Sequence, residues 1–176
     1  MVDQTFSASN VQDSGRKAEI SVIFPYYNEK ETLPKTLELI LNQTLKPYEV
    51  IFVNSSSTDS SSKLIDEWIE STESEIIFRN VFEGSNTPAS SKNVGLRKAK
   101  KKWVAFMDCG LLFERDWLEK QWDFIQKEKV DIVSGVAPSS NRLFLIESSS
   151  TFDGSIIQLK PFFSKISFLT LLLDAR

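Results

Sequence analysis

Carboxylates, lysines and tyrosines are the side chains on which any acid–base chemistry in this sequence must depend. The 176 residues include no histidine and a single cysteine, Cys109. This composition excludes a Ser-His or Cys-His nucleophile, a histidine general base and a metal site that is held by imidazole. One cysteine makes no intramolecular disulfide and fits a reducing compartment. A metal ion bound here would therefore be a hard cation held by oxygen atoms.

The elements that must position these side chains alternate between strands and helices. From Glu19 onward, short runs rich in β-branched and aromatic residues alternate with amphipathic stretches, which predicts βαβ units. The predicted strands are residues 19–24, 49–53, 75–79, 103–107 and 130–134. The predicted helices begin near Asn28, near Ser61, at Pro88 and near Arg115. The alternation predicts an α/β fold with a mainly parallel central sheet that is covered by helices on both faces.

The loops that follow the predicted strands are the candidate binding segments, because ligands of parallel sheets bind at the carboxyl ends of the strands. These loops are residues 25–29, 54–59, 80–85 and 108–110. Asp59 stands where it could cap the second helix. The loops therefore supply carboxylate, amide and hydroxyl oxygens at one edge of the sheet.

The net charge argues against a dedicated nucleic-acid binder. The chain carries 21 Lys and Arg against 24 Asp and Glu, a formal charge of −3, with a pI near 5.2. Nucleic-acid binding requires a net basic face. Residues 97–102 are locally basic, and we interpret them as a solvated helix end, with contact to an anionic lipid or an acceptor as the alternative.

The chain divides into three segments. We expect a flexible leader at 1–18, a core at 19–135, and an extension of the same domain at 136–176 that looks truncated. The first residues have no signal-peptide pattern, and the longest apolar run, 166–173, is far shorter than a membrane span. Residues 161–173 read as a buried helix. The expected location is cytoplasmic, with peripheral association at the inner face of a membrane as the alternative.

Five ordered motifs resemble one known family. They are the strand end Pro25-Tyr26-Tyr27-Asn28-Glu29, the helix end Asn42-Gln43-Thr44, the Ser/Thr/Asp loop 54–59, the segment Ser90-Ser91-Lys92-Asn93-Val94-Gly95-Leu96 and the strand end Phe106-Met107-Asp108. Together they resemble the N-terminal half of glycosyltransferase family 2, over about residues 19–135. The resemblance implies the GT-A fold, a Rossmann-like three-layer α/β/α arrangement, and a nucleotide-diphosphate sugar such as a UDP-sugar as the donor substrate.

The resemblance also implies a nucleoside pocket in the first two loops. Pro25, Tyr27 and Glu29 would hold the base and ribose, although Pro25 could simply end a strand and Glu29 could stabilise a helix N-terminus. Asn54 and Ser55 would be further nucleotide contacts. Asn54 replaces the usual acidic residue and carries no charge. Ser56 replaces a glycine that would allow positive φ.

Two further residues match the family's diphosphate site. Asp108 stands where the Asp-x-Asp motif holds a divalent cation, Mg²⁺ or Mn²⁺, but here the second carboxylate is replaced by Gly110. One carboxylate can suffice when substrate phosphates and water complete the coordination. Lys92 replaces the usual arginine and could reach the phosphates, with a salt bridge as the alternative.

The catalytic base is the part that the sequence does not supply. In the family it lies C-terminal to the matched region, together with a frequent Gln-x-x-Arg-Trp motif that is absent here. Asp153 is the only nearby candidate, and the pattern does not assign it the role. We therefore expect an inverting sugar transferase that acts on an unidentified glycan, lipid or protein. The alternative is a truncated or degenerate nucleotide-binding module without turnover. A nucleotidyltransferase is disfavoured because no Gly-rich loop follows the first strand.

Overall fold

The computed structural model describes residues 17–84, 87–128, 132–134 and 171–174. Six strands form one sheet in the order β3-β2-β1-β4-β6-β5. The strands are β1 (Lys17–Tyr26), β2 (Lys46–Asn54), β3 (Ile77–Phe82), β4 (Trp103–Phe106), β5 (Ile132–Ser134) and β6 (Leu171–Asp174). The first four are parallel, and β6 runs antiparallel to both β4 and β5. The predicted mainly parallel α/β sheet is confirmed.

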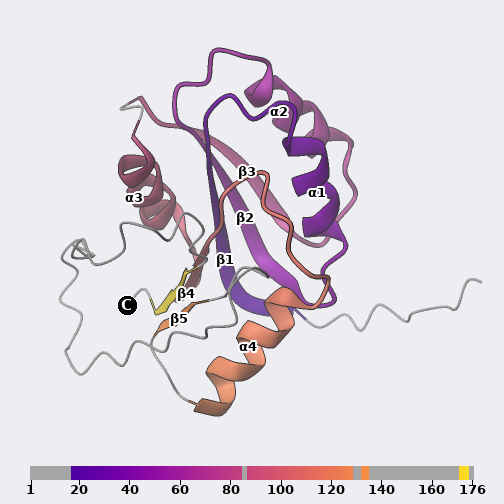
Figure 1. The fold of residues 1–176 in the computed structure, drawn as a ribbon, viewed down its shortest axis with the longest axis vertical. Helices are drawn as coiled ribbons and strands as arrows, with labels where there is room; N and C mark the ends of the chain where they lie inside the picture. Colours follow the sequence, from indigo (N-terminus) through magenta and orange to yellow (C-terminus); the bar gives the residue numbers. More distant parts are fainter. Residues whose placement is uncertain (1–16, 85–86, 129–131, 135–170, 175–176) are drawn as a thin grey trace, which may run out of the picture.

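Helices cover both faces of the sheet, which gives the three layers that Figure 1 shows. The helices are α1 (Leu33–Leu41), α2 (Ser61–Ser71), α3 (Pro88–Lys98) and α4 (Trp117–Glu128). One core cluster joins α1, α2 and α4 to the sheet, and a second cluster joins α3 to the opposite face. Along β2, Val50 and Phe52 belong to the first cluster and Ile51 and Val53 to the second. This alternation follows from the two-residue period of a strand.

Some element boundaries differ from those predicted. The first helix begins at Leu33 rather than near Asn28, because Asn28 has a φ of 55° and the chain turns before the helix starts. The third strand lies at 77–82 rather than 75–79. The first strand begins at Lys17, so the last two residues of the predicted leader belong to the sheet.

The prediction of a helix at 161–173 is wrong for residues 171–173. Residues 171–174 form strand β6, which pairs with β4 from Leu171 opposite Phe106 to Asp174 opposite Trp103. A short apolar run fits a buried strand as well as a helix, and β4 offers an unpaired edge that the run can complete. Residues 161–170 lie outside the described residues. None of the helices in the described part is long and apolar enough to cross a lipid bilayer.

Candidate functional site

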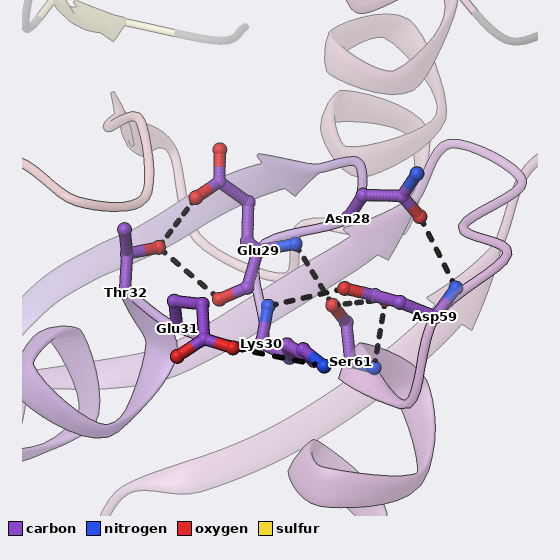
Figure 2. A network of polar contacts seen from close by, with 7 residues as sticks. All are labelled: Asn28, Glu29, Lys30, Glu31, Thr32, Asp59 and Ser61. Atoms are coloured by element: carbon purple, nitrogen blue, oxygen red, sulfur yellow. Dashed lines mark hydrogen bonds and ion pairs between the residues drawn. The ribbon is translucent and has the colours of Figure 1, made fainter.

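The loops after β1 and β2 are joined by the side chain of Asn28. Its Oδ1 accepts hydrogen bonds from the backbone N–H groups of Thr58, at 2.8 Å, and Asp59, at 3.2 Å. Its own N–H donates to Ser57 Oγ at 3.1 Å. Asparagine tolerates the left-handed backbone at this position better than most residues do. Asn28 therefore fixes the two loops against each other, and Figure 2 shows its contact with Asp59.

Glu29 and Asp59 continue this junction toward the first two helices. The Glu29 N–H donates to Ser61 Oγ at 2.8 Å, and the Glu29 carboxylate accepts from the Thr32 hydroxyl (Figure 2). Asp59 Oδ1 accepts from the Ser61 N–H at 2.9 Å, as expected of a cap. The hydrogen bond from the Ser61 hydroxyl is the main cause that holds the pKa of Asp59 below its ordinary value. The carboxylate of Glu29 thus lies in the turn before α1.

Asn54 ends β2 and is almost fully buried. Its Oδ1 accepts from the Ser57 N–H at 2.8 Å, which leaves its amide nitrogen as the atom able to reach a ligand. Ser56 has a φ of 63°, the left-handed backbone that a glycine would adopt more readily. Its hydroxyl donates to the carbonyl of Glu83 at 3.1 Å. The loop therefore keeps the glycine-like backbone without a glycine.

A buried hydroxyl and carboxylate cluster links the β2 loop to α3. Ser55 Oγ lies 2.5 Å from Ser91 Oγ, and Ser90 Oγ donates to Glu83 Oε1 at 2.9 Å. Ser91 Oγ also lies 3.5 Å from Glu83 Oε2. Ser55, Glu83 and Ser91 are all buried. The side chain of Ser55 is thus turned toward α3, and its role as a nucleotide contact stays a prediction.

Lys92 and Asp108 face each other across the edge of the sheet. Lys92 lies in α3, and its Nζ is 3.9 Å from Oδ1 of Asp108, which follows β4. Both side chains are partly exposed, at 36% and 43%, so a ligand can reach them. Next to Asp108, burial is the main cause that raises the pKa of the Cys109 thiol, followed by the charges of Glu29 and Asp108. Cys109 is partly buried against the core, and its raised pKa disfavours the nucleophilic thiolate near neutral pH.

Pro25 and Tyr27 complete the set of predicted residues. Pro25 lies within β1, opposite Val53 in the register with β2, and is half-buried. Tyr27 follows the strand, and 46% of it is exposed. An exposed aromatic ring at the carboxyl edge of a parallel sheet is available to stack on a ligand.

The structure thus brings the predicted residues to one edge of the sheet. The loops after β1, β2 and β4 carry Glu29, Asn54 and Asp108, and α3 carries Lys92. In the part of the chain that the structure describes, no three His, Cys, Asp or Glu side chains form a metal-holding group. The donor set fits a cation only as Asp108 together with oxygen atoms from a ligand and water.

Sequence reasoning did not single out Asn28 or Glu83 as site residues. Asn28 is recognisable only from its left-handed backbone, and Glu83 only from contacts with residues seven and eight positions away. The motif residue Gln43 has a structural role instead. Its side chain donates to the Glu114 carbonyl at 2.8 Å and accepts from the Leu118 N–H at 3.0 Å, which docks α4 onto the end of α1.

Comparison with known sequences gives consistent matches. The family model described as Glycosyl transferase family 2 matches residues 21–170. A protein of Haemophilus influenzae described as an uncharacterized glycosyltransferase is 31% identical over 154 residues, which are 87% of this chain and 56% of the relative. Another uncharacterized glycosyltransferase, from Rickettsia bellii, is 37% identical over 112 residues, which are 64% of this chain and 16% of the relative. The chain thus spans little more than half of one relative and a small part of the other.

Comparison with solved structures supports the same fold. The mannosyltransferase PcManGT from Pyrobaculum calidifontis, in complex with GDP-Man and Mn²⁺, matches with a TM-score of 0.61 and 29% identity, over 70% of this chain and 36% of that one. Staphylococcus aureus TarS residues 1–349 in complex with UDP matches with a TM-score of 0.57 and 23% identity, over 65% and 34% of the two chains. The second likeness is evidence for the fold alone.

Proposed function

This chain belongs to glycosyltransferase family 2, and from that membership we propose that it binds a nucleotide-diphosphate sugar and a divalent cation for inverting sugar transfer. The observation that carries the proposal is the Lys92–Asp108 pair. A lysine ammonium and a carboxylate lie 3.9 Å apart, partly exposed, at the carboxyl edge of a parallel sheet. This edge is where ligands of such sheets bind. The mannosyltransferase match holds GDP-Man and Mn²⁺, which agrees with this chemistry.

The proposed donor site assigns one task to each loop. Tyr27 would stack on the base, the Asn54 amide nitrogen would donate to a carbonyl of the base, and Glu29 would accept from the ribose hydroxyls. These three residues follow β1 and β2, whose loops Asn28 holds together. Pro25 and Ser55 would shape the wall of the same pocket. The nucleoside end of the donor therefore lies over β1 and β2.

The diphosphate would lie over β4 and α3. Lys92 can turn from Asp108 toward a phosphate oxygen and stabilise the charge that develops on the leaving diphosphate. Asp108 would hold Mg²⁺ or Mn²⁺, which supplies positive charge to the same leaving group when bound. Inverting transfer also needs a base that takes the proton of the acceptor hydroxyl. Asp153, the one candidate from the sequence, lies outside the described residues, so no base is assigned.

Calorimetric titration with UDP, GDP and their sugar conjugates, with and without Mn²⁺, tests the donor site. We expect metal-dependent binding that is lost in Asp108→Ala. The matched control is Glu38→Ala, which removes an exposed carboxylate that pairs with Lys35 on α1, away from the site. Glu38→Ala should bind like the wild type. Failure of the folded chain to bind any of these nucleotides would refute the proposed donor site.

Assay of sugar transfer separates the proposed activity from its alternative. A nucleotide-binding module without turnover is consistent with the single carboxylate, Asp108, that the described residues offer to a cation. Incubation with a radiolabelled donor and a mixture of glycan, lipid and peptide acceptors should produce labelled acceptor and released nucleoside diphosphate. Donor binding without either product would support the alternative.

A further inference from the structure

The end of α3 and the turn that joins it to β4 concentrate positive charge on a chain that is negative overall. Five of the six residues at 97–102 are Lys or Arg, whereas the whole chain has a formal charge of −3. The side chains of Arg97, Lys98, Lys100 and Lys102 are exposed. Among the described residues, Arg97, Lys98 and Lys100 form no ion pair. We call residues 97–102 the basic turn.

A buried polar network fixes the backbone of the basic turn. The carboxylate of Glu49, fully buried in β2, accepts from the Lys100 N–H at 2.6 Å and from Ser21 Oγ at 2.6 Å. Ser21 Oγ in turn accepts from the Lys101 N–H at 3.1 Å. The Arg79 guanidinium pairs with the same carboxylate and donates to the Lys98 carbonyl at 2.8 Å.

This network places a charged carboxylate in the protein interior in order to hold a turn at the surface. Burial of a carboxylate is unfavourable unless it is paired and fully hydrogen-bonded. Here Glu49 and its partners Ser21 and Arg79 also bind the backbone at three cationic positions, Lys98, Lys100 and Lys101. A fixed turn loses little conformational freedom when it binds a partner. The exposed cations are therefore presented in one arrangement before any partner arrives.

The basic turn lies at the opposite end of the sheet from the donor site. It precedes β4, whereas Asp108 follows β4, so the two are separated by at least the length of this four-residue strand, roughly 13 Å at about 3.3 Å per residue. A partner of the basic turn would not contact a donor held at Asp108.

We propose that the basic turn binds the surface of an anionic lipid bilayer and tethers the domain there, with the donor site facing away from the membrane. Four to eight clustered Lys and Arg side chains are the typical requirement for such binding. A single-stranded nucleic acid would need exposed aromatic rings for stacking, whereas the nearby Tyr48 ring is covered by Lys101 at 3.7 Å and Lys17 at 5.1 Å. The compact ammonium groups that dominate the turn suit non-directional attraction to lipid headgroups.

Co-sedimentation with vesicles tests the proposal on the whole chain. We compare phosphatidylcholine vesicles with vesicles that also contain phosphatidylglycerol, in low and high salt. The variant Arg97→Gln/Lys98→Gln/Lys100→Gln removes three exposed cations without touching the buried network. Each cation near an anionic surface strengthens binding by roughly fivefold, so the variant should bind the anionic vesicles more weakly by on the order of 100-fold. The control Lys35→Gln/Lys63→Gln/Lys127→Gln removes the same charge from exposed positions elsewhere.

The outcomes separate the tether from general charge effects and from the donor site. Salt-sensitive binding to anionic vesicles alone, lost in the first variant and kept in the control, would support the tether. No binding at low salt, or equal loss in both variants, would overturn it. Tighter binding to a homopolymeric RNA than to the anionic vesicles would overturn the choice of lipid. Nucleotide titration of the first variant is a separate readout, because its donor site is unchanged.

Discussion

Lys92 takes part in the candidate site through an ion pair at the surface. Its partner Asp108 lies 3.9 Å away, and both side chains are partly exposed, so the ion pair is weak and can be exchanged for a phosphate. Asn54, by contrast, is buried and uses its oxygen within the loop. In the proposed donor site, these two residues would serve different ends of the donor. Lys92 would act on the phosphates and Asn54 on the base.

Substitution of Lys92 tests its proposed role on the diphosphate. Lys92→Met should weaken binding of a nucleoside diphosphate by on the order of tenfold, because one charge-assisted contact is lost. Lys92→Arg should retain or strengthen binding, since the guanidinium can contact two phosphate oxygens. Titration calorimetry measures both, with Lys63→Met, an exposed lysine on α2, as the control. Equal affinity of Lys92→Met and the wild type would remove Lys92 from the site.

Glu83 is the residue that we expect to position α3 next to the β2 loop. Glu83→Ala would leave the Ser90 hydroxyl without its acceptor and remove one of the acceptors near the Ser91 hydroxyl, which keeps the Thr87 carbonyl, at a cost of about 1–3 kcal/mol in unfolding free energy. It would also loosen the first turn of α3, which precedes Lys92, so nucleotide affinity should fall by on the order of tenfold. Glu83→Gln keeps one acceptor oxygen and should have a smaller effect.

Glu49→Gln is the matched control for Glu83. It alters a buried carboxylate that also accepts from a serine, but at the opposite edge of the sheet. It should lower the unfolding free energy and leave the nucleotide affinity unchanged. If both variants lowered stability and neither changed nucleotide affinity, Glu83 would be a structural residue only.

Among the elements, α3 packs directly against β1 at Gly95. A Cβ atom added at Gly95 would lie 2.4 Å from Ile23 Cγ2 in β1, closer than such atoms come. Gly95→Ala should therefore push α3 away from the sheet and lower the unfolding free energy by about 1–3 kcal/mol, despite the higher helix propensity of alanine. Denaturant unfolding measures this effect. Gly84→Ala, whose added atom meets only Phe82 at 3.8 Å, should change stability little. An unchanged stability in Gly95→Ala would show that α3 can shift at no cost.

Elements with a clear period could be predicted from the sequence, and contacts between distant residues could not. The four parallel strands follow from alternating apolar runs, and the starts of α2 and α3 follow from polar residues that accept from their first N–H groups, Asp59 and the N-cap Thr87. The beginning of α1 was missed because the left-handed Asn28 depends on its hydrogen bonds to the next loop, thirty residues on. The strand at 171–174 was not predicted because its short apolar run has no period that distinguishes a strand from a helix. The run is a strand because it pairs with the edge of β4.

At the scale of the whole molecule, the candidate site is part of the central sheet rather than an appendage. Its loops follow β1, β2 and β4, and most residues of each of these strands are buried. A ligand that binds such a site stabilises the folded state as a whole. At a ligand concentration of 100 times Kd the gain is about 2.7 kcal/mol. Opening of the sheet should therefore become rarer when a nucleotide and Mn²⁺ bind.

Cys109 is a built-in reporter for this opening, since it is the single cysteine of the chain and lies beside Asp108. Because burial raises the pKa of its thiol above the ordinary value, little thiolate exists in the folded state near neutral pH, and labelling by a thiol reagent should be slow. The labelling rate of Cys109 should still increase with pH in the range where the labelling rate of an exposed thiol has already reached its maximum.

Labelling of Cys109 should also slow when the donor binds. A nucleoside diphosphate with Mn²⁺ at 100 times Kd should decrease the labelling rate by on the order of 100-fold if labelling requires global opening. Asp108→Ala should be labelled at the same rate with and without the nucleotide. Fast labelling in the free protein, with a pH midpoint of an exposed thiol, would contradict the packing of Cys109 beside Asp108. Slow labelling that the nucleotide leaves unchanged would instead contradict a donor site at this edge of the sheet.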